Sequence, residues 1–215
     1  MRAAFFDLDG TLADTRVDIA STVNHARRDL GLEELPVATV VANVGCGARH
    51  LLEHSIPEAP VPYEELKGMF LGHYAEHCTE TVSLYPGVEE TLDELARRGW
   101  RMGVVTNKPR VAVMPILEKF SLLRHFGDAV VAGGDCVELK PSPAPLAECA
   151  VRMGADRVSA GDWMIGDNWT DMRCAENAGV NGLFCGFGFG RLDDASFDAK
   201  ADCFPDILRY LKAGR

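Results

Sequence analysis

Two carboxylates near the N-terminus are the first residues whose types and spacing could carry chemistry. Asp7 and Asp9 end the apolar run in FFDLDGT and are separated by one leucine. Side chains two positions apart in an extended strand point to the same side, so these two would face together. Carboxylates at such close range repel each other, and a divalent cation such as Mg²⁺, which prefers oxygen ligands, would remove that penalty. Two solvated loop aspartates would show the same spacing, so the pair alone leaves both interpretations open.

A second pair of acids follows the apolar run WMI, in the segment GDNWTD. Asp167 and Asp171 are four residues apart and would share one face if a helix begins there. The alternative interpretation is that Asp167 or Asn168 simply caps that helix. Either way, carboxylates again stand at the end of an apolar run.

Two further segments offer groups that suit a phosphate. In VVTNKP, the Thr106 hydroxyl and the Asn107 amide could donate to a phosphate oxygen, although a turn before Pro109 has the same composition. In LKPSP, Lys140 precedes a proline and is therefore disfavoured in a helix. Because the net charge is -10, an anionic substrate would need local positive charge. Lys140 could supply that charge or could be an ordinary surface lysine.

The elements that must position these groups are short apolar runs alternating with amphipathic stretches. Strands are predicted over residues 3–7, 101–106, 128–132, 162–166 and 180–185. Helices are predicted over residues 88–98, 111–123, 143–153 and 170–178. This alternation predicts an α/β fold with a parallel sheet covered on both faces. Ligands bind beyond the carboxyl ends of the strands in such sheets, which is where three of the polar clusters stand.

Residues 15–83 interrupt this alternation. They contain sequence patterns typical of helices and few typical of strands, which predicts a helical insertion after the first strand. The chain would then divide into a core, residues 1–14 and 84–215, and an inserted helical domain. In the last part of the core, residues 186–204 are rich in Gly, Phe and Asp and are predicted to form surface loops. A final helix is predicted over residues 205–215.

Taken in order, these motifs resemble the haloacid dehalogenase-like hydrolase superfamily. The match consists of DLDGT, then T-N, then K-P, then G-D-x-x-x-D, and it extends over nearly the whole chain. The stretch VVAGGDCVELKPSPAPL is further similar to the phosphoglycolate phosphatase group. The resemblance implies a Rossmann-like parallel sheet core with a small α-helical cap inserted after the first strand. It also implies phosphatase activity on a small phosphorylated metabolite.

The resemblance also implies a role for each motif residue. Asp7 matches the nucleophile that forms an aspartyl phosphate, and Asp9 matches the acid and base that serves the leaving group and then water. Lys140 matches the lysine that balances negative charge at the phosphoryl group. Phosphate contacts would come from the residues at the remaining matching positions, namely Thr11, Thr106 and Asn107.

Mg²⁺ is the cofactor that this resemblance implies. Its ligands would be the Asp7 carboxylate, the Asp9 backbone carbonyl and Asp167. Asp171 would either ligate the ion, directly or through water, or hold Lys140 in place. The family usually has Ser after the G-D pair, whereas this chain has Asn168, which can also form hydrogen bonds.

The segment VGCGARHLL resembles the substrate-specificity loop of the cap. Gly45 and Gly47 would let the backbone approach the ligand, and Arg49 could contact a carboxylate or a second anionic group. The alternative is that the two glycines only separate two helices and that Arg49 is solvated.

Other chemistries of the superfamily fit less well. Dehalogenase relatives lack an acid at the position of Asp9. Mutase relatives carry a histidine in the helix entering the cap, where this chain has Asp18 and Ile19, and phosphonate-cleaving relatives need a cap lysine, where the only candidate is Lys67. A mutase or phosphotransferase, and a binding protein without turnover, remain the alternatives to a phosphatase.

Composition limits the remaining possibilities. The acidic balance argues against a nucleic-acid partner, and no run reaches the ~18 apolar residues of a membrane helix. Seven scattered cysteines without a C-x-x-C pair indicate reduced thiols and a cytoplasmic protein. The six histidines lack an H-E-x-x-H motif and are interpreted as surface residues of the insertion or as packing residues. A monomer and a homodimer both remain open.

Overall fold

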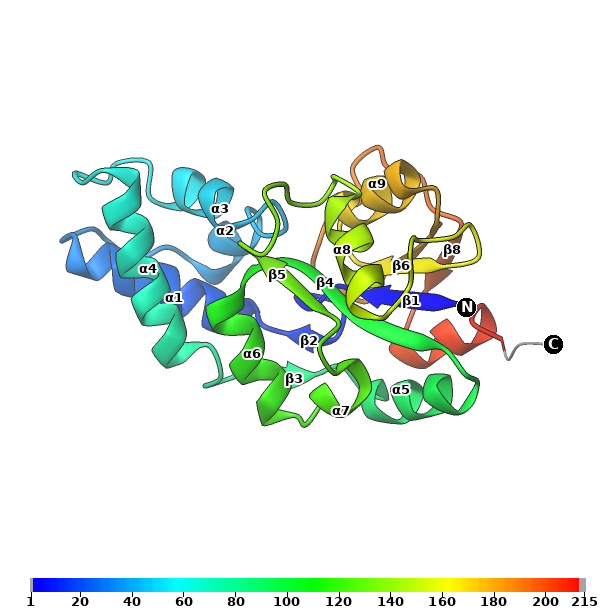
Figure 1. Ribbon diagram of the computed structural model, residues 1–215. Coiled ribbons are helices and arrows are strands. Elements are labelled where there is room, and N and C mark those ends of the chain that lie inside the picture. Colours follow the sequence, from blue (N-terminus) through cyan, green and yellow to red (C-terminus); the bar gives the residue numbers. More distant parts are fainter. Residues whose placement is uncertain (1, 213–215) are drawn as a thin grey trace.

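The computed structural model describes residues 2–212 of the chain. Its centre is a six-stranded parallel sheet in the order β5-β4-β1-β6-β7-β8 (Figure 1). The predicted α/β fold with a parallel sheet is therefore confirmed. The strands are β1 Ala3–Phe6, β4 Arg101–Pro109, β5 Val130–Gly133, β6 Trp163–Gly166, β7 Asn181–Cys185 and β8 Ala199–Ala201.

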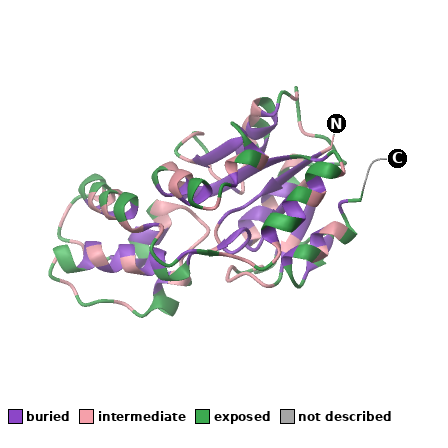
Figure 2. Ribbon diagram, turned by 90° about the horizontal axis from the view of Figure 1, so that it is seen from below, coloured by how far each residue is buried: buried purple, intermediate pink, exposed green. Residues whose placement is uncertain are grey.

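Helices cover both faces of this sheet, and β1 shows why. All four of its residues are buried, and alternate side chains point to opposite faces. Ala4 and Phe6 join a core with helices α5–α7 and η1, whereas Ala3 and Phe5 join a core with α8 and α9. Figure 2 shows the buried strands between helices whose outer sides are exposed. The bounds are α5 Val88–Arg97, α6 Arg110–Lys119, α7 Leu123–Phe126, α8 Ala144–Arg152, α9 Trp169–Ala178 and η1 Phe204–Arg209.

Four helices lie between β2 (Ala13–Asp14) and β3 (Ser83–Leu84), which pair antiparallel. These helices form the left part of Figure 1 and bury a separate hydrophobic cluster that includes Val23, Leu52 and Phe70. We call α1–α4 and the loops between them the helical segment. Its helices are α1 Arg16–Asp29, α2 Val37–Val41, α3 Ala48–Ser55 and α4 Tyr63–His77.

Asp18 ties the two ends of the helical segment together. Its buried carboxylate accepts hydrogen bonds from the Thr81 backbone N–H at 2.9 Å, from the Thr81 hydroxyl at 2.5 Å and from the Val82 N–H at 3.0 Å. We call the parallel sheet with α5–α9 and η1 the sheet domain, and the helical segment therefore leaves and rejoins it at one fixed junction.

The C-terminal part differs from the prediction. Residues 199–201 form the edge strand β8 where a surface loop was expected, because a strand of three residues is too short to show a periodic pattern. The final helix is the short 3₁₀-helix η1, and residues 213–215 of the predicted helix lie outside the described residues. Strand β4 also extends three residues beyond the predicted end at Thr106.

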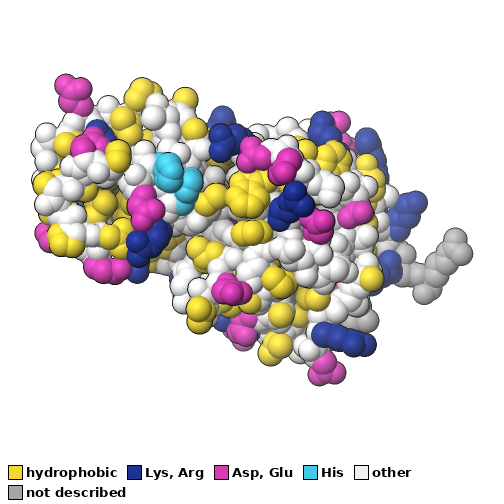
Figure 3. Space-filling model, turned by 90° about the horizontal axis from the view of Figure 1, so that it is seen from above, with side chains coloured by type: hydrophobic (Ala, Val, Ile, Leu, Met, Phe, Trp, Pro, Cys, Tyr) yellow, Lys and Arg dark blue, Asp and Glu magenta, His cyan; other side chains and the backbone are white. Residues whose placement is uncertain are grey.

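The surface carries charges of both signs. Figure 3 shows acidic and basic side chains interspersed over the face seen from above. Across residues 2–212, no helix combines the length and the apolar character that crossing a membrane requires.

Candidate active site

The carboxyl ends of β1, β4 and β6 meet at one edge of the sheet and open into a cavity. Beyond β1, the Asp7 N–H still donates to the Ile165 carbonyl oxygen at 2.9 Å, so the chain stays aligned with β6. The helical segment covers this edge (Figure 1). Both parts line the cavity, the sheet domain through Asp7, Asp9, Thr106, Asn107, Lys108, Asp167 and Asn168 and the helical segment through Ile19, Gly45, Gly47, Leu51, Phe70 and Tyr74.

Three acids converge at the floor of the site. Carboxylate oxygens of Asp7, Asp167 and Asp171 lie within 4.8 Å of one another, and all three residues are buried. Burial, and then the charges of the other two acids, raise the pKa of Asp167 well above its usual range. A divalent cation would offset this repulsion, and hard carboxylate oxygens are the donors that Mg²⁺ prefers. The residues therefore fit the predicted ion.

The backbone around Asp167 is shaped to hold its carboxylate. Asp167 Oδ2 accepts hydrogen bonds from the N–H groups of Phe189 at 2.9 Å and of Gly190 at 2.7 Å. On the other side, Gly10 has a φ of +76°, and a Cβ atom there would lie 1.8 Å from Asp167 Oδ2. Only glycine fits this position. The glycine-rich stretch after β7, predicted to be a surface loop, is thus a wall of the site.

Lys140 is the cation among these acids. Its Nζ lies 3.1 Å from Asp7 Oδ1 and 2.6 Å from Asp171 Oδ1, and it donates to the Val105 carbonyl oxygen at 2.7 Å. Burial acts to lower the pKa of Lys140, but Asp171 and Asp7 outweigh it, and the pKa lies above its usual value. The ammonium group is therefore held charged beside the Asp7 carboxylate.

Asp171 fixes both Lys140 and the start of α9. Its second oxygen, Oδ2, accepts from the Asn168 N–H at 2.9 Å, and Asn168 caps the helix through a reciprocal capping box. The two interpretations of GDNWTD are therefore compatible, because one motif caps the helix and presents acids to the site.

Lys108 is a site residue that the sequence interpretation missed. Its side chain is 1% exposed, and its Nζ lies 2.8 Å from Asp9 Oδ1. The same Nζ donates to the Tyr74 hydroxyl of α4 and lies 4.6 Å from the centre of that ring. The signal was present in VVTNKP, since a charged residue directly follows Thr106 and Asn107. Asp9 also accepts from the Thr15 hydroxyl at 2.7 Å, so both polar partners hold its Oδ1.

The predicted phosphate-binding residues differ in their placement. Thr106 lines the cavity and is buried. Asn107 also lines it, but its Nδ2 donates to the carbonyl oxygens of Gly45 and Lys140, both at 2.9 Å, and its Oδ1 accepts from the Lys140 N–H at 2.9 Å. Thr11 is fully buried and is not among the cavity-lining residues, and within residues 2–212 its Oγ1 has no hydrogen-bond partner.

The residues predicted for the specificity loop lie in two different places, and only the glycines are at the cavity. Gly45 and Gly47 line the cavity with φ angles of +114° and +87°, and a Cβ on Gly45 would lie 2.4 Å from Asn168 Nδ2. The structure does not bring Arg49 to this cavity. Its side chain is 61% exposed, pairs with Glu53 at 3.1 Å and lies over the Tyr63 ring at 3.8 Å. At the cavity, the helical segment instead contacts a cation of the sheet domain, Lys108, through Tyr74.

Comparison with known proteins places this site in a family. The sequence model of the haloacid dehalogenase-like hydrolases matches residues 4–184, a range that contains the acids, both lysines and the helical segment. The chain belongs to the haloacid dehalogenase-like hydrolase family. The family resemblance predicted from the motifs is confirmed.

Individual relatives of the family match over nearly the full length. A phosphoglycolate phosphatase of Cereibacter sphaeroides is 35% identical over 99% of this chain and 100% of its own. That of Aquifex aeolicus is 33% identical over 98% of this chain and 97% of its own. A crystal structure from Haemophilus somnus, described as a predicted phosphoglycolate phosphatase, superposes with a TM-score of 0.88 and 29% identity, covering 99% of this chain and 98% of that one.

Proposed function

We propose that this chain is a Mg²⁺-dependent phosphatase that hydrolyses a small phosphorylated metabolite through an aspartyl phosphate on Asp7. The observation that carries the proposal is the position of Lys140 Nζ, 3.1 Å from Asp7 Oδ1, beside two further buried acids. Within its hydrolase family, this chain's full-length relatives carry the name phosphoglycolate phosphatase, which makes it a phosphoric monoester hydrolase. We take 2-phosphoglycolate as the first candidate substrate.

The geometry of Asp7 suits nucleophilic attack. Its Oδ1 is held by Lys140 and by the Leu8 N–H at 2.7 Å, which leaves Oδ2 to attack phosphorus. The bond between phosphorus and the leaving oxygen breaks as the aspartyl phosphate forms. The charged Lys140 stabilises the negative charge that gathers on the phosphoryl oxygens.

Asp9 would serve both halves of the reaction. Its Oδ1 is fixed by Lys108 and Thr15, and its other oxygen would give a proton to the leaving alkoxide. Asp9 would then take a proton from the water that attacks the aspartyl phosphate, so that inorganic phosphate leaves and Asp7 is regenerated.

Mg²⁺ would be held by Asp7, Asp167 and the Asp9 backbone carbonyl, with Asp171 acting chiefly through Lys140. When bound, the ion supplies positive charge that screens the phosphate from the surrounding acids. Asn107 would position Lys140 and the Gly45 loop rather than donate to phosphate, because its amide is already bonded to their backbones.

We further propose that residues 15–83 act as a cap domain over the core, residues 1–14 and 84–215. The contact between Lys108 and Tyr74 and the bond from Asn107 to Gly45 both join the two parts across the cavity. Closure by such a cap would exclude bulk water from the aspartyl phosphate until the attacking water is positioned.

Phosphate release from a panel of phosphorylated metabolites tests this function. The panel contains 2-phosphoglycolate, hexose phosphates, nucleoside monophosphates and pyrophosphate. We expect turnover with Mg²⁺, complete loss with EDTA and recovery when Mg²⁺ is added in excess. Turnover that survives EDTA would contradict the metal dependence, whereas phosphate found on a second hydroxyl compound rather than in water would favour a phosphotransferase or mutase.

A further inference from the structure

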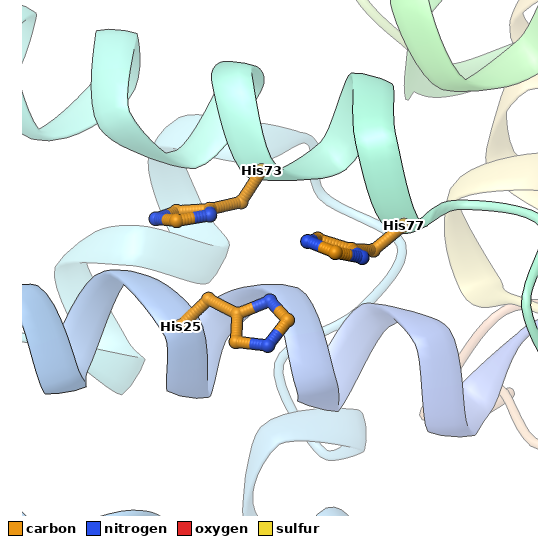
Figure 4. Close-up of side chains that lie close together, drawn as sticks. All are labelled: His25, His73 and His77. Atoms are coloured by element: carbon orange, nitrogen blue, oxygen red, sulfur yellow. The ribbon is translucent and has the colours of Figure 1, made fainter.

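A cluster of three histidines lies in the helical segment, away from the acids of the active site. His25 comes from α1, and His73 and His77 come from successive turns of α4. One nitrogen of each ring lies within 4.8 Å of one nitrogen of the other two. Figure 4 shows the His73 and His77 rings facing the His25 ring across the space between the two helices. The structure thus brings together side chains from two distant parts of the sequence, which the sequence alone did not connect.

Within residues 2–212, at least one nitrogen of each ring makes no hydrogen bond, although His77 Nε2 lies 3.8 Å from Glu76 Oε2. His73 Nε2 is 2.6 Å from Asp29 Oδ2, and His77 Nδ1 is 2.6 Å from Glu80 Oε1, which leaves His73 Nδ1 and His77 Nε2. His25 Nδ1 is buried and finds no hydrogen-bond partner among the described residues. A carboxylate on the far nitrogen of an imidazole is the arrangement that orients metal-ligating histidines.

From this geometry we propose that His25, His73 and His77 form a second metal site that binds a divalent transition ion such as Zn²⁺. Three imidazoles and one water complete a tetrahedral zinc shell. Ligand nitrogens in such a shell are about 3.4 Å apart at Zn–N distances of about 2.1 Å. The His73 and His77 side chains are 25% and 27% exposed, so small rotations can close the remaining gap and an ion can enter from solvent.

The surroundings of the cluster favour a cation. Asp29, Glu76 and Glu80 face the two histidines of α4, while Arg28 is the positive charge that acts on His25. Burial, followed by Arg28 and the other two histidines, lowers the pKa of His25.

A metal ion bound at this site would cross-link α1 and α4. Tyr74 lies between His73 and His77 in α4, is buried, and contacts Lys108 through its hydroxyl. An ion held by His73 and His77, on the neighbouring face of this helix, would therefore stabilise the element that carries Tyr74 to the active site. This inference does not depend on the proposed phosphatase activity, because binding is measured without substrate.

Cobalt and zinc titrations of the full chain test the site. Excess Mg²⁺ is kept present to occupy the acidic site. We expect one Co²⁺ per chain with the absorption of a tetrahedral nitrogen and oxygen shell, displaced by Zn²⁺, and an increase in Tm with Zn²⁺. An octahedral spectrum, or a strong thiolate-to-cobalt band pointing to the adjacent Cys78, would overturn the assignment on the wild-type protein alone.

Substitutions then locate the ion. His25→Gln and His77→Gln should each weaken Zn²⁺ binding by more than about 10-fold, since loss of an outer partner alone costs ~10–100-fold. Asp29→Asn should weaken it less. The matched control is His50→Gln/His54→Gln, which removes another pair of neighbouring histidines spaced by four residues, with ring centres 3.9 Å apart. Equal Zn²⁺ affinity of His25→Gln and wild type, or loss in the control, would refute the site.

Discussion

Asp7→Asn will abolish phosphatase turnover, with kcat expected to fall by about 10⁴-fold or more, the scale on which loss of a covalent nucleophile acts. The substitution keeps the size of the side chain and removes the carboxylate oxygen that attacks phosphorus. The oxygen of the new amide could still accept from Lys140 and from the Leu8 N–H, so the local structure should persist.

Steady-state phosphate release with the best substrate of the panel measures this effect. The matched control is Asp93→Asn, which makes the same change on an exposed acid of α5 and should keep wild-type activity. If Asp7→Asn retained more than about a hundredth of the wild-type kcat, Asp7 would not be the nucleophile, because removal of a single hydrogen-bond donor alone costs about 10²–10³-fold.

Lys140→Met is expected to damage activity and stability together. Activity should fall by about 10²–10³-fold, since a preorganised charge beside the phosphoryl group is lost. The free energy of unfolding should fall by about 3–5 kcal/mol, because Asp7 and Asp171 are left buried without their cation. Equilibrium urea unfolding, with activity measured in parallel, gives both quantities.

The stability deficit of Lys140→Met should depend on pH. Burial raises the pKa of Asp171 to about 7 even though Lys140 acts to lower it. Without Lys140, the folded-state pKa lies higher still, and above that of the unfolded chain. Such a carboxyl destabilises the fold when it is ionised. This destabilisation disappears as the pH falls through its folded-state pKa, because the carboxyl becomes protonated. The deficit is therefore expected to be large at about pH 9 and smaller at about pH 5.5.

Lys67→Met is the control for this experiment. The Lys67 side chain is 42% exposed on α4 and pairs with Glu64 at 3.7 Å, so its loss should change stability by less than about 0.5 kcal/mol. If Lys140→Met changed the free energy of unfolding no more than Lys67→Met at every pH, the ion pairs of Lys140 with Asp7 and Asp171 would not stabilise the site.

The core of the site could be predicted because its signals are local. Asp7 and Asp9 adjoin one apolar run, Asp167 adjoins another, and parallel strands bring their carboxyl ends to one edge. The sheet itself was predictable for a related reason, since β1, β6 and residues 102–105 of β4 are short apolar runs. Their chain order leaves few ways to arrange them.

The parts that escaped prediction depend on contacts between distant segments. Lys108 belongs to the site because β4 runs to Pro109 and because Tyr74 of the helical segment meets its ammonium group. Asn107 was assigned to phosphate from its residue type, and only the fold shows that its amide bonds the Gly45 and Lys140 backbones. For Arg49, the sequence left open a contact with an anionic group or a solvated side chain, and its partner Glu53 holds it at the surface.

Covalent trapping in Asp9→Asn tests most directly whether an aspartyl phosphate forms on Asp7. With p-nitrophenyl phosphate, the leaving group needs no proton, so phosphorylation of Asp7 should proceed while hydrolysis, which needs Asp9 as base, becomes slow. We predict a burst of one p-nitrophenolate per chain, and reduction of the quenched enzyme by borohydride should convert residue 7 to homoserine. Linear p-nitrophenolate release without a burst, together with an unmodified Asp7, would contradict the covalent mechanism.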